Sequence, residues 1–198
     1  MLAHEARTKA RPVTNLSYAR ILPRPVNVAN VQSAGTSHSE PVSPLRSAVG
    51  LVGWLLLSFA AAAFGSFFTP GDWYAALRKP AWNPPNWIFG PVWSVLYIMM
   101  AVSAWLVWRR GGFRSNSRPL AFFLIQLLLN AVWSWLFFGL QHPALAFAEI
   151  LLLWLAIVGT ILAFVRVHRL AAWLLSPYLA WVTFATALNF ILWRLNAS

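Results

Sequence analysis

Five long apolar runs occupy most of this chain, and together they restrict the folds open to it. They cover about residues 47–68, 87–108, 119–141, 143–165 and 170–193. Each is longer than the roughly 18 residues that indicate a membrane-spanning helix, and the only acidic or basic side chain in any of them is Glu149. The strands of a transmembrane barrel would be shorter and would alternate in polarity. The sequence therefore predicts an all-α membrane protein, a bundle of five transmembrane helices.

The composition supports a membrane protein over a soluble one. Hydrophobic residues make up 60% of the chain and charged residues 10%, whereas soluble domains have about 45–50% and about 25%. The formal net charge of +11 would suggest nucleic acid as the partner of a soluble protein. Here the basic residues lie in the N-terminal segment and between the apolar runs, a pattern typical of membrane topology. We therefore expect a lipid bilayer, and no nucleic acid, as the partner.

The first 45 residues differ from the rest of the chain. They are basic and rich in Ser, Pro and Asn, with no helical apolar period, so we predict a disordered tail over 1–45 and one membrane domain over 46–198. A basic, acid-poor tail has two interpretations, an organellar transit peptide or a bacterial extension. The corresponding locations are the mitochondrial outer membrane and the bacterial cell membrane.

The basic residues also predict the orientation of the bundle. With five spans, the N-terminal flank shares one side of the membrane with the second and fourth connections. That side carries seven arginines, which are Arg46, Arg109, Arg110, Arg114, Arg118, Arg166 and Arg169. The opposite side carries three basic residues, which are Arg78, Lys79 and Arg194. The positive-inside rule therefore places the N-terminus in the cytoplasm.

Polar and aromatic side chains recur at helical spacing inside three of the runs. Gln126, Asn130, Trp133 and Phe137 share one helix face, and this face should look inward because Gln and Asn avoid lipid. Similar faces contain Trp93, Tyr97 and Met100 in the second run and Trp181, Ala185 and Leu188 in the fifth. Two interpretations remain open, an aromatic cage for a flat apolar ligand or ordinary packing between helices.

Glu149 is a candidate functional acid because carboxyl groups inside a membrane are costly. A structural, hydrogen-bonded role is the alternative. Other chemistry is not expected. The four histidines all lie in the tail or in connections, the chain has no cysteine, and no residue cluster suggests a metal site or a Ser–His–Asp triad. We therefore predict neither a metal nor a required cofactor.

Several segments carry a more specific signal. WYAALRKPAWNPPNWIFGPVWSVLY spans 73–97, and FLIQLLLNAVWSWLFFG spans 123–139. ALAFAE and LLSPYLAWVTFATALNFILWRLN follow at 144–149 and 174–196. In order and spacing, these segments resemble the tryptophan-rich sensory protein family, also called the translocator protein, TspO or peripheral benzodiazepine receptor family. The resemblance covers about residues 48–196 and leaves out the tail.

The resemblance implies a five-helix bundle, usually a homodimer, in which a long first loop acts as a lid over a pocket. In that family the pocket binds porphyrins such as protoporphyrin IX, as well as sterols and benzodiazepine-type compounds. The pocket positions correspond here to Tyr74, Pro84, Trp93, Tyr97, Asn130, Trp133, Trp181 and Ala185. The polar and aromatic faces deduced from spacing overlap this set.

The resemblance leaves the activity open. We expect a membrane receptor or sensor that binds porphyrins and regulates tetrapyrrole metabolism. The alternatives are a transporter of tetrapyrroles or other amphipaths, a light-dependent porphyrin-degrading enzyme with Trp93 and Trp181 as photochemical residues, and a structural protein without a ligand. Sterol binding is expected to be poor, because Phe190 and Ile191 stand where the sterol motif of animal members requires a Tyr.

Overall fold

The computed structural model describes residues 43–68 and 70–197. In these ranges the chain forms seven α-helices and one π-helix. They are α2 (Pro44–Ser66), α3 (Asp72–Ala76), α4 (Asn86–Trp108), α5 (Gly112–Ser134), the π-helix η1 (Trp135–Gly139), α6 (Pro143–Val165), α7 (Arg169–Leu174) and α8 (Ser176–Asn196). The predicted tail lies outside the described residues except for its end, and there Pro44 and Leu45 already belong to α2.

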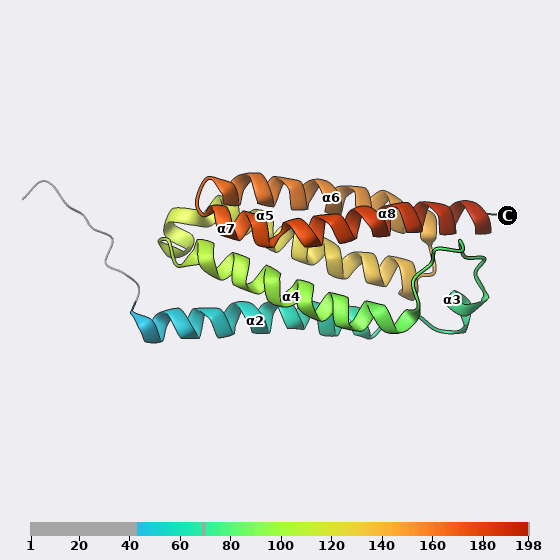
Figure 1. Ribbon diagram of the computed structural model, residues 1–198, viewed down its shortest axis with the longest axis horizontal. Coiled ribbons are helices and arrows are strands. Elements are labelled where there is room, and N and C mark those ends of the chain that lie inside the picture. The colour runs from blue at the N-terminus through green and yellow to red at the C-terminus, as the bar shows by residue number, and fades with distance from the viewer. Residues whose placement is uncertain (1–42, 69, 198) are drawn as a thin grey trace, which may run out of the picture. The chain divides into compact units, whose positions relative to one another are not determined.

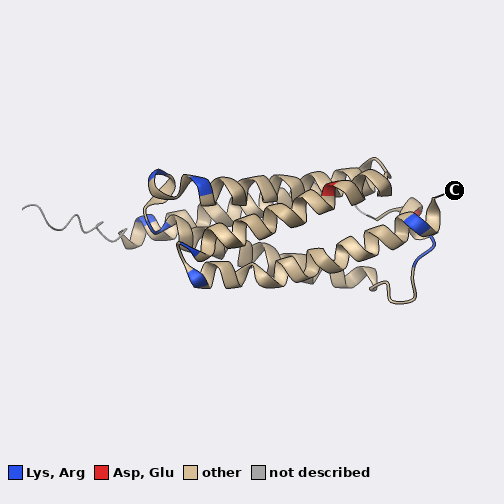
Figure 2. Cartoon of the chain, turned by 90° about the horizontal axis from the view of Figure 1, so that it is seen from above, with Lys and Arg blue, Asp and Glu red and all other residues tan. Residues whose placement is uncertain are grey.

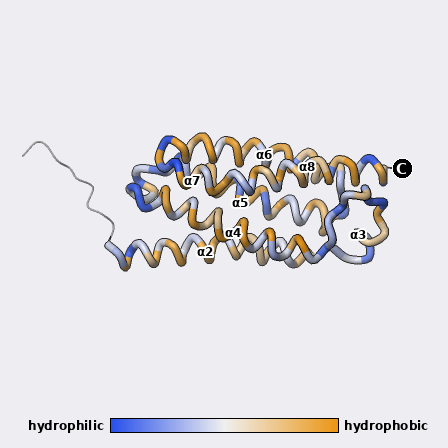
Figure 3. Tube along the Cα trace, in the orientation of Figure 1, coloured by the Kyte–Doolittle hydropathy of each residue, from blue (hydrophilic) through white to orange (hydrophobic). Residues whose placement is uncertain are grey.

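Five of the helical segments are long and apolar enough to cross a membrane, as the apolar runs predicted. They lie side by side and run lengthwise through the bundle (Figure 1). The closest pairs are α5 with α6, α2 with α4, and α6 with α8. Hydrophobic residues cover the long helices and hydrophilic ones gather at their ends (Figure 3). Exposed leucines such as Leu56, Leu128 and Leu152 are therefore suited to contact lipid.

The third span begins earlier than its hydropathy indicated. The sequence predicted a start at residue 119, whereas α5 begins at Gly112, is kinked at Asn116 (φ −125°, ψ 30°) and then continues through Arg118. Gly111 and Gly112 reverse the chain direction with φ values of 122° and 64°, a region that favours glycine. Asn116 then donates hydrogen bonds from Nδ2 to the carbonyl oxygens of Val107 (3.3 Å) and Arg110 (3.2 Å). The predicted start therefore lies three residues after the kink, and hydropathy missed only the short helical segment before it, because a charged segment can still be helical.

The fifth span is interrupted near its start. The sequence predicted one helix over 170–193, whereas α7 ends at Leu174 and α8 begins at Ser176. Pro177 lies in the first turn of α8, where its missing N–H costs no helical hydrogen bond. Tyr178 follows it with a fully buried side chain.

Basic residues collect at the two ends of the bundle (Figure 2). The seven arginines counted above lie where α2 begins, where α4, α5 and α6 meet their connections, and where α7 begins. Arg78, Lys79 and Arg194 lie at the other end, near the C-terminus. The arrangement gives the orientation prediction a direct test.

We expect Ser115→Cys and Ala81→Cys to react with an impermeant maleimide from opposite sides of the membrane. The chain has no cysteine, so each label reports one position, and both side chains are exposed. Labelling in inside-out and right-side-out vesicles measures the side. Labelling of both positions from the same side would contradict five spans.

Candidate functional site

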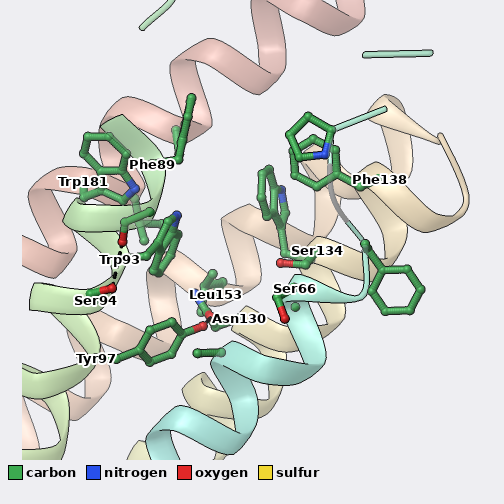
Figure 4. Close-up of a pocket in the computed structure, with 18 of the residues that line it drawn as sticks. Ser66, Phe89, Trp93, Ser94, Tyr97, Asn130, Ser134, Phe138, Leu153 and Trp181 are labelled. Atoms are coloured by element: carbon green, nitrogen blue, oxygen red, sulfur yellow. Dashed lines mark hydrogen bonds between the residues drawn. The ribbon is translucent and has the colours of Figure 1, made fainter. Parts of the chain in front are cut away.

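A cavity of about 350 Å³ opens inside the half of the bundle that contains α3. All five long helical segments contribute to its wall, and so does the connection between α2 and α4. Its aromatic lining consists of Phe59, Phe68, Tyr74, Phe89, Trp93, Tyr97, Trp133, Phe138 and Trp181. The lining residues Phe59 and Ser66 of α2 and Gly90 and Ser94 of α4 are exposed, so the cavity opens along these two helices. Figure 4 shows the side chains that line it.

Most of the residues suggested by the family resemblance meet at this cavity. Tyr74, Trp93, Tyr97, Asn130, Trp133, Trp181 and Ala185 all line it. Pro84 is the member of the set that lies outside its wall. The carbonyl oxygen of Pro84 instead accepts a hydrogen bond from Asn83 Nδ2 (3.0 Å) within the first connection.

Asn130 joins two buried tyrosines at the cavity wall. Its Oδ1 accepts a hydrogen bond from the Tyr97 hydroxyl (2.5 Å), and its Nδ2 donates one to the Tyr178 hydroxyl (3.2 Å). This chain crosses from α4 through α5 to α8. The two tyrosines therefore hold both polar atoms of the Asn130 amide.

The indole N–H groups divide into engaged and free ones. Within residues 43–68 and 70–197, indole hydrogen bonds come from Trp105, Trp133 and Trp154. Trp133 Nε1 donates to Asn189 Oδ1 (3.0 Å), and Asn189 Nδ2 donates to the Pro143 carbonyl (2.9 Å). The indoles of Trp93 and Trp181 line the cavity without such a bond and remain able to donate to a ligand.

The aromatic rings of the wall hold one another in place. The rings of Trp93 and Tyr97 have centroids 5.5 Å apart, and Trp93 meets Tyr178 edge-on at 6.2 Å. On the other side, Trp181 meets Phe89 edge-on at 5.9 Å. Such pairs are each worth about 0.5–1.5 kcal/mol beyond burial, so much of the aromatic surface is preorganised.

The first connection covers one end of the cavity and is braced from within. The Tyr74 hydroxyl donates to Asn83 Oδ1 (3.2 Å), and burial raises the pKa of Tyr74. Lys79 Nζ donates to the carbonyls of Ala75 (3.0 Å) and Leu77 (3.1 Å) and lies 4.8 Å from the centroid of the Tyr74 ring. The ammonium group of Lys79 thus stabilises the connection itself.

A second brace ties the connection to the end of α8. The backbone N–H of Arg78 donates to Asn196 Oδ1 (2.9 Å), and Asn196 Nδ2 donates back to the Arg78 carbonyl (3.0 Å). The side-chain amide of Asn196 therefore binds both the backbone N–H and the backbone carbonyl of Arg78. We call this pair of bonds the Asn196 clamp.

Glu149 lies on the inward face of α6, together with Ile150 and Leu153. Ile150 and Leu153 line the cavity and Glu149 does not. Neither of its carboxyl oxygens has a hydrogen-bond partner among the described residues, and the same holds for both amide atoms of Gln126. The functional role suggested for Glu149 stays a prediction.

Sequence reasoning missed several residues of the site. Tyr178 and Asn189 supply partners for Asn130 and Trp133, and Phe89 and Phe138 extend the aromatic wall. A helical signal existed for two of them. Tyr178 lies three residues before Trp181, and Asn189 lies four after Ala185, so both are on the helix face already identified from spacing.

Comparison with known proteins gives a consistent result. The model of the TspO/MBR family matches residues 54–194. The tryptophan-rich protein TspO of Archaeoglobus fulgidus is 44% identical over 150 residues, covering 74% of this chain and 97% of that protein. The human translocator protein is 42% identical over 153 residues, covering 75% and 90%. The tryptophan-rich sensory protein of Cereibacter sphaeroides is 40% identical over 137 residues, covering 69% and 85%.

Proposed function

We propose that this chain, which belongs to the TspO/MBR family, is a membrane receptor whose cavity binds porphyrins. The chain is a multi-pass integral membrane protein. Two of its relatives are named a sensory protein and a translocator protein. A receptor reading matches the first of these names. Occupancy of the cavity by protoporphyrin would then regulate tetrapyrrole metabolism.

The observation that carries this proposal is the aromatic wall. Nine aromatic side chains line a cavity of about 350 Å³, which falls in the range of roughly 300–1,000 Å³ typical of small-molecule sites. A planar macrocycle gains most from such a wall, because its whole face can stack on rings. The opening along α2 and α4 allows the edges of a large ligand to extend beyond the cavity.

Polar groups would orient the macrocycle. The free indole N–H groups of Trp93 and Trp181 can donate to ligand nitrogen or oxygen atoms. Carboxylate substituents need cations or water, so we place them toward the first connection. Arg78 is the better cation there, because its side chain is exposed whereas two of the hydrogen bonds of Lys79 Nζ already go to carbonyls of the connection.

We expect Trp93→Phe and Trp181→Phe each to weaken protoporphyrin binding by roughly 1 kcal/mol, about fivefold. Phe keeps most of the apolar volume but removes the indole N–H and part of the stacking area. Titration of the purified protein with protoporphyrin, followed by tryptophan fluorescence, measures the change. The matched controls are Trp87→Phe and Trp173→Phe, whose side chains are 74% and 72% exposed.

Equal losses at the cavity and the control positions would show that tryptophan content, and not this cavity, governs binding. Two further readouts separate receptor from transporter and enzyme. Protoporphyrin flux into sealed vesicles would indicate transport. A covalent change of the bound porphyrin in light, slowed in the Trp93 and Trp181 variants, would indicate an enzyme.

A further inference from the structure

A cluster of two arginines and two tryptophans joins α2 to α4 at the arginine-rich end of the bundle. The guanidinium carbon of Arg46 lies 5.9 Å from the centroid of the Trp108 ring, and that of Arg109 lies 4.5 Å from the Trp105 ring. Trp105 Nε1 donates to the Ser47 carbonyl (2.8 Å). We call these four side chains the Arg–Trp cluster.

The two helices approach closely beside this cluster. A Cβ atom added to Gly50 would lie 2.2 Å from Cζ3 of Trp108, so only a glycine admits the indole there. The hydrogen bond from Trp105 and the close approach of Trp108 hold both indoles against α2. The two indoles of the cluster are therefore fixed in position, and each of the two arginines lies against a fixed indole.

The cation–π contacts leave the hydrogen-bonding capacity of each arginine free. A guanidinium group that lies over an indole ring directs its N–H donors outward in its own plane. Both arginines are exposed, and the side-chain hydrogen bonds of the cluster within the described residues come from Trp105 alone. The guanidinium groups of Arg46 and Arg109 are thus available to donate hydrogen bonds to an acceptor.

Carboxylates that could serve as this acceptor are scarce in the chain. Its four acidic residues are Glu5, Glu40, Asp72 and Glu149, against fifteen Lys and Arg. Asp72 begins α3 at the other end of the bundle, and Glu149 lies inside α6. Residues 1–42 contain two acids and five basic residues, so this segment adds positive charge. This excess of positive charge favours an anion from outside the chain as the acceptor.

We propose that the Arg–Trp cluster is a binding site for the phosphate headgroup of an anionic phospholipid. Guanidinium groups bind phosphate oxygens through paired, charge-assisted hydrogen bonds. Trp105 and Trp108 lie in the last turn of a membrane-spanning helix, the depth at which tryptophan meets lipid headgroups. The site lies at the opposite end of the bundle from the lid over the aromatic cavity.

The face of α2 next to Arg46 identifies a lipid, and not a soluble anion, as the occupant. Val49, Val52 and Leu56 follow Arg46 along one side of the helix, and they are 64%, 54% and 68% exposed. An acyl chain can lie against this apolar strip while its headgroup meets the arginines. A free phosphate would gain nothing from the strip.

Native mass spectrometry of the purified protein, titrated with phosphatidylglycerol or phosphatidylcholine, tests the proposal. We expect the protein to retain phosphatidylglycerol in preference, and the double variant Arg46→Gln/Arg109→Gln to lose at least about tenfold in that affinity. The double variant Arg46→Lys/Arg109→Lys keeps the charge without the planar donors, so its affinity should fall in between.

The matched control is Arg166→Gln/Arg169→Gln, which removes the same charge from the same end of the bundle. Its affinity should stay near that of the unmodified protein, and an equal loss would reduce the site to general charge attraction and overturn the proposal. Equal retention of the two lipids would overturn it as well. So would displacement of phosphatidylglycerol by inorganic phosphate. Thermal unfolding in the same detergent, with a midpoint near that of the unmodified protein, verifies that each variant is folded.

Discussion

Asn130→Leu is expected to destabilise the protein by about 3 kcal/mol, because it leaves two buried tyrosine hydroxyls without their partner. Tyr97 is 6% exposed and Tyr178 is fully buried, and the hydroxyl of each is hydrogen-bonded to Asn130. An orphaned buried polar group costs about 1–3 kcal/mol. Thermal unfolding in detergent should show a midpoint lower by roughly 6–10 °C.

Gln126→Leu provides a matched control one turn away on the same helix. Both amide atoms of Gln126 are buried without a partner among the described residues, so an apolar replacement should cost little or should stabilise. The combined variant Asn130→Leu/Tyr97→Phe/Tyr178→Phe removes all three polar groups and should recover much of the lost stability. If Gln126→Leu were as damaging as Asn130→Leu, the hydrogen-bonded chain would not be the cause.

Asn196→Ala is expected to open the first connection about tenfold more often. The clamp consists of two hydrogen bonds, each worth about 0.5–1.5 kcal/mol, and both go to the backbone of Arg78. Limited proteolysis with trypsin measures the opening through cleavage after Arg78, since the bond after Lys79 precedes Pro80 and resists trypsin. Dissociation of protoporphyrin should accelerate in parallel, because the same segment covers the cavity.

Asn196→Asp separates the two bonds of the clamp. A carboxylate still accepts from the Arg78 N–H but cannot donate to the Arg78 carbonyl, so cleavage should rise less than in Asn196→Ala. The control Leu195→Ala alters the neighbouring exposed residue and should leave cleavage unchanged. If ligand dissociation rises without faster cleavage, Asn196 acts on the cavity through α8 and not through the connection.

Hydropathy predicted the spans well where apolar residues end at a helix terminus. The fourth span, 143–165, matches α6 at both ends. It missed the short helical segment of α5 that contains Arg114 and precedes the kink at Asn116, because a transfer scale measures affinity for lipid and not helical conformation. It did not indicate the break before α8 for the opposite reason, since the break falls at Leu175, an apolar residue that continues the apolar run of α7.

The candidate site was predictable to the extent that it depends on helix faces. Spacing alone identified the inward faces of Asn130 and Trp181, because the period of the helix determines which residues lie together. The partners of those residues were not predictable, since the contact of Asn130 with Tyr178 depends on how far α8 is rotated and shifted along its axis. The Asn196 clamp joins residues 118 positions apart, a pairing that no local pattern encodes.

The π-helix at the end of α5 has a consequence for how this chain would respond to a change in length. Its wider turn brings both Phe137 and Phe138 against Trp133, with ring centroids 5.1 Å and 5.9 Å apart. An α-helix has one residue fewer per hydrogen-bonded turn than a π-helix. Deleting one residue between Trp135 and Gly139 would therefore leave a regular α-helix that still spans the membrane. It would turn one of the two phenyl rings out toward lipid. Deletion of one codon in this segment would therefore leave membrane insertion unchanged but would alter which side chains form the wall of the cavity.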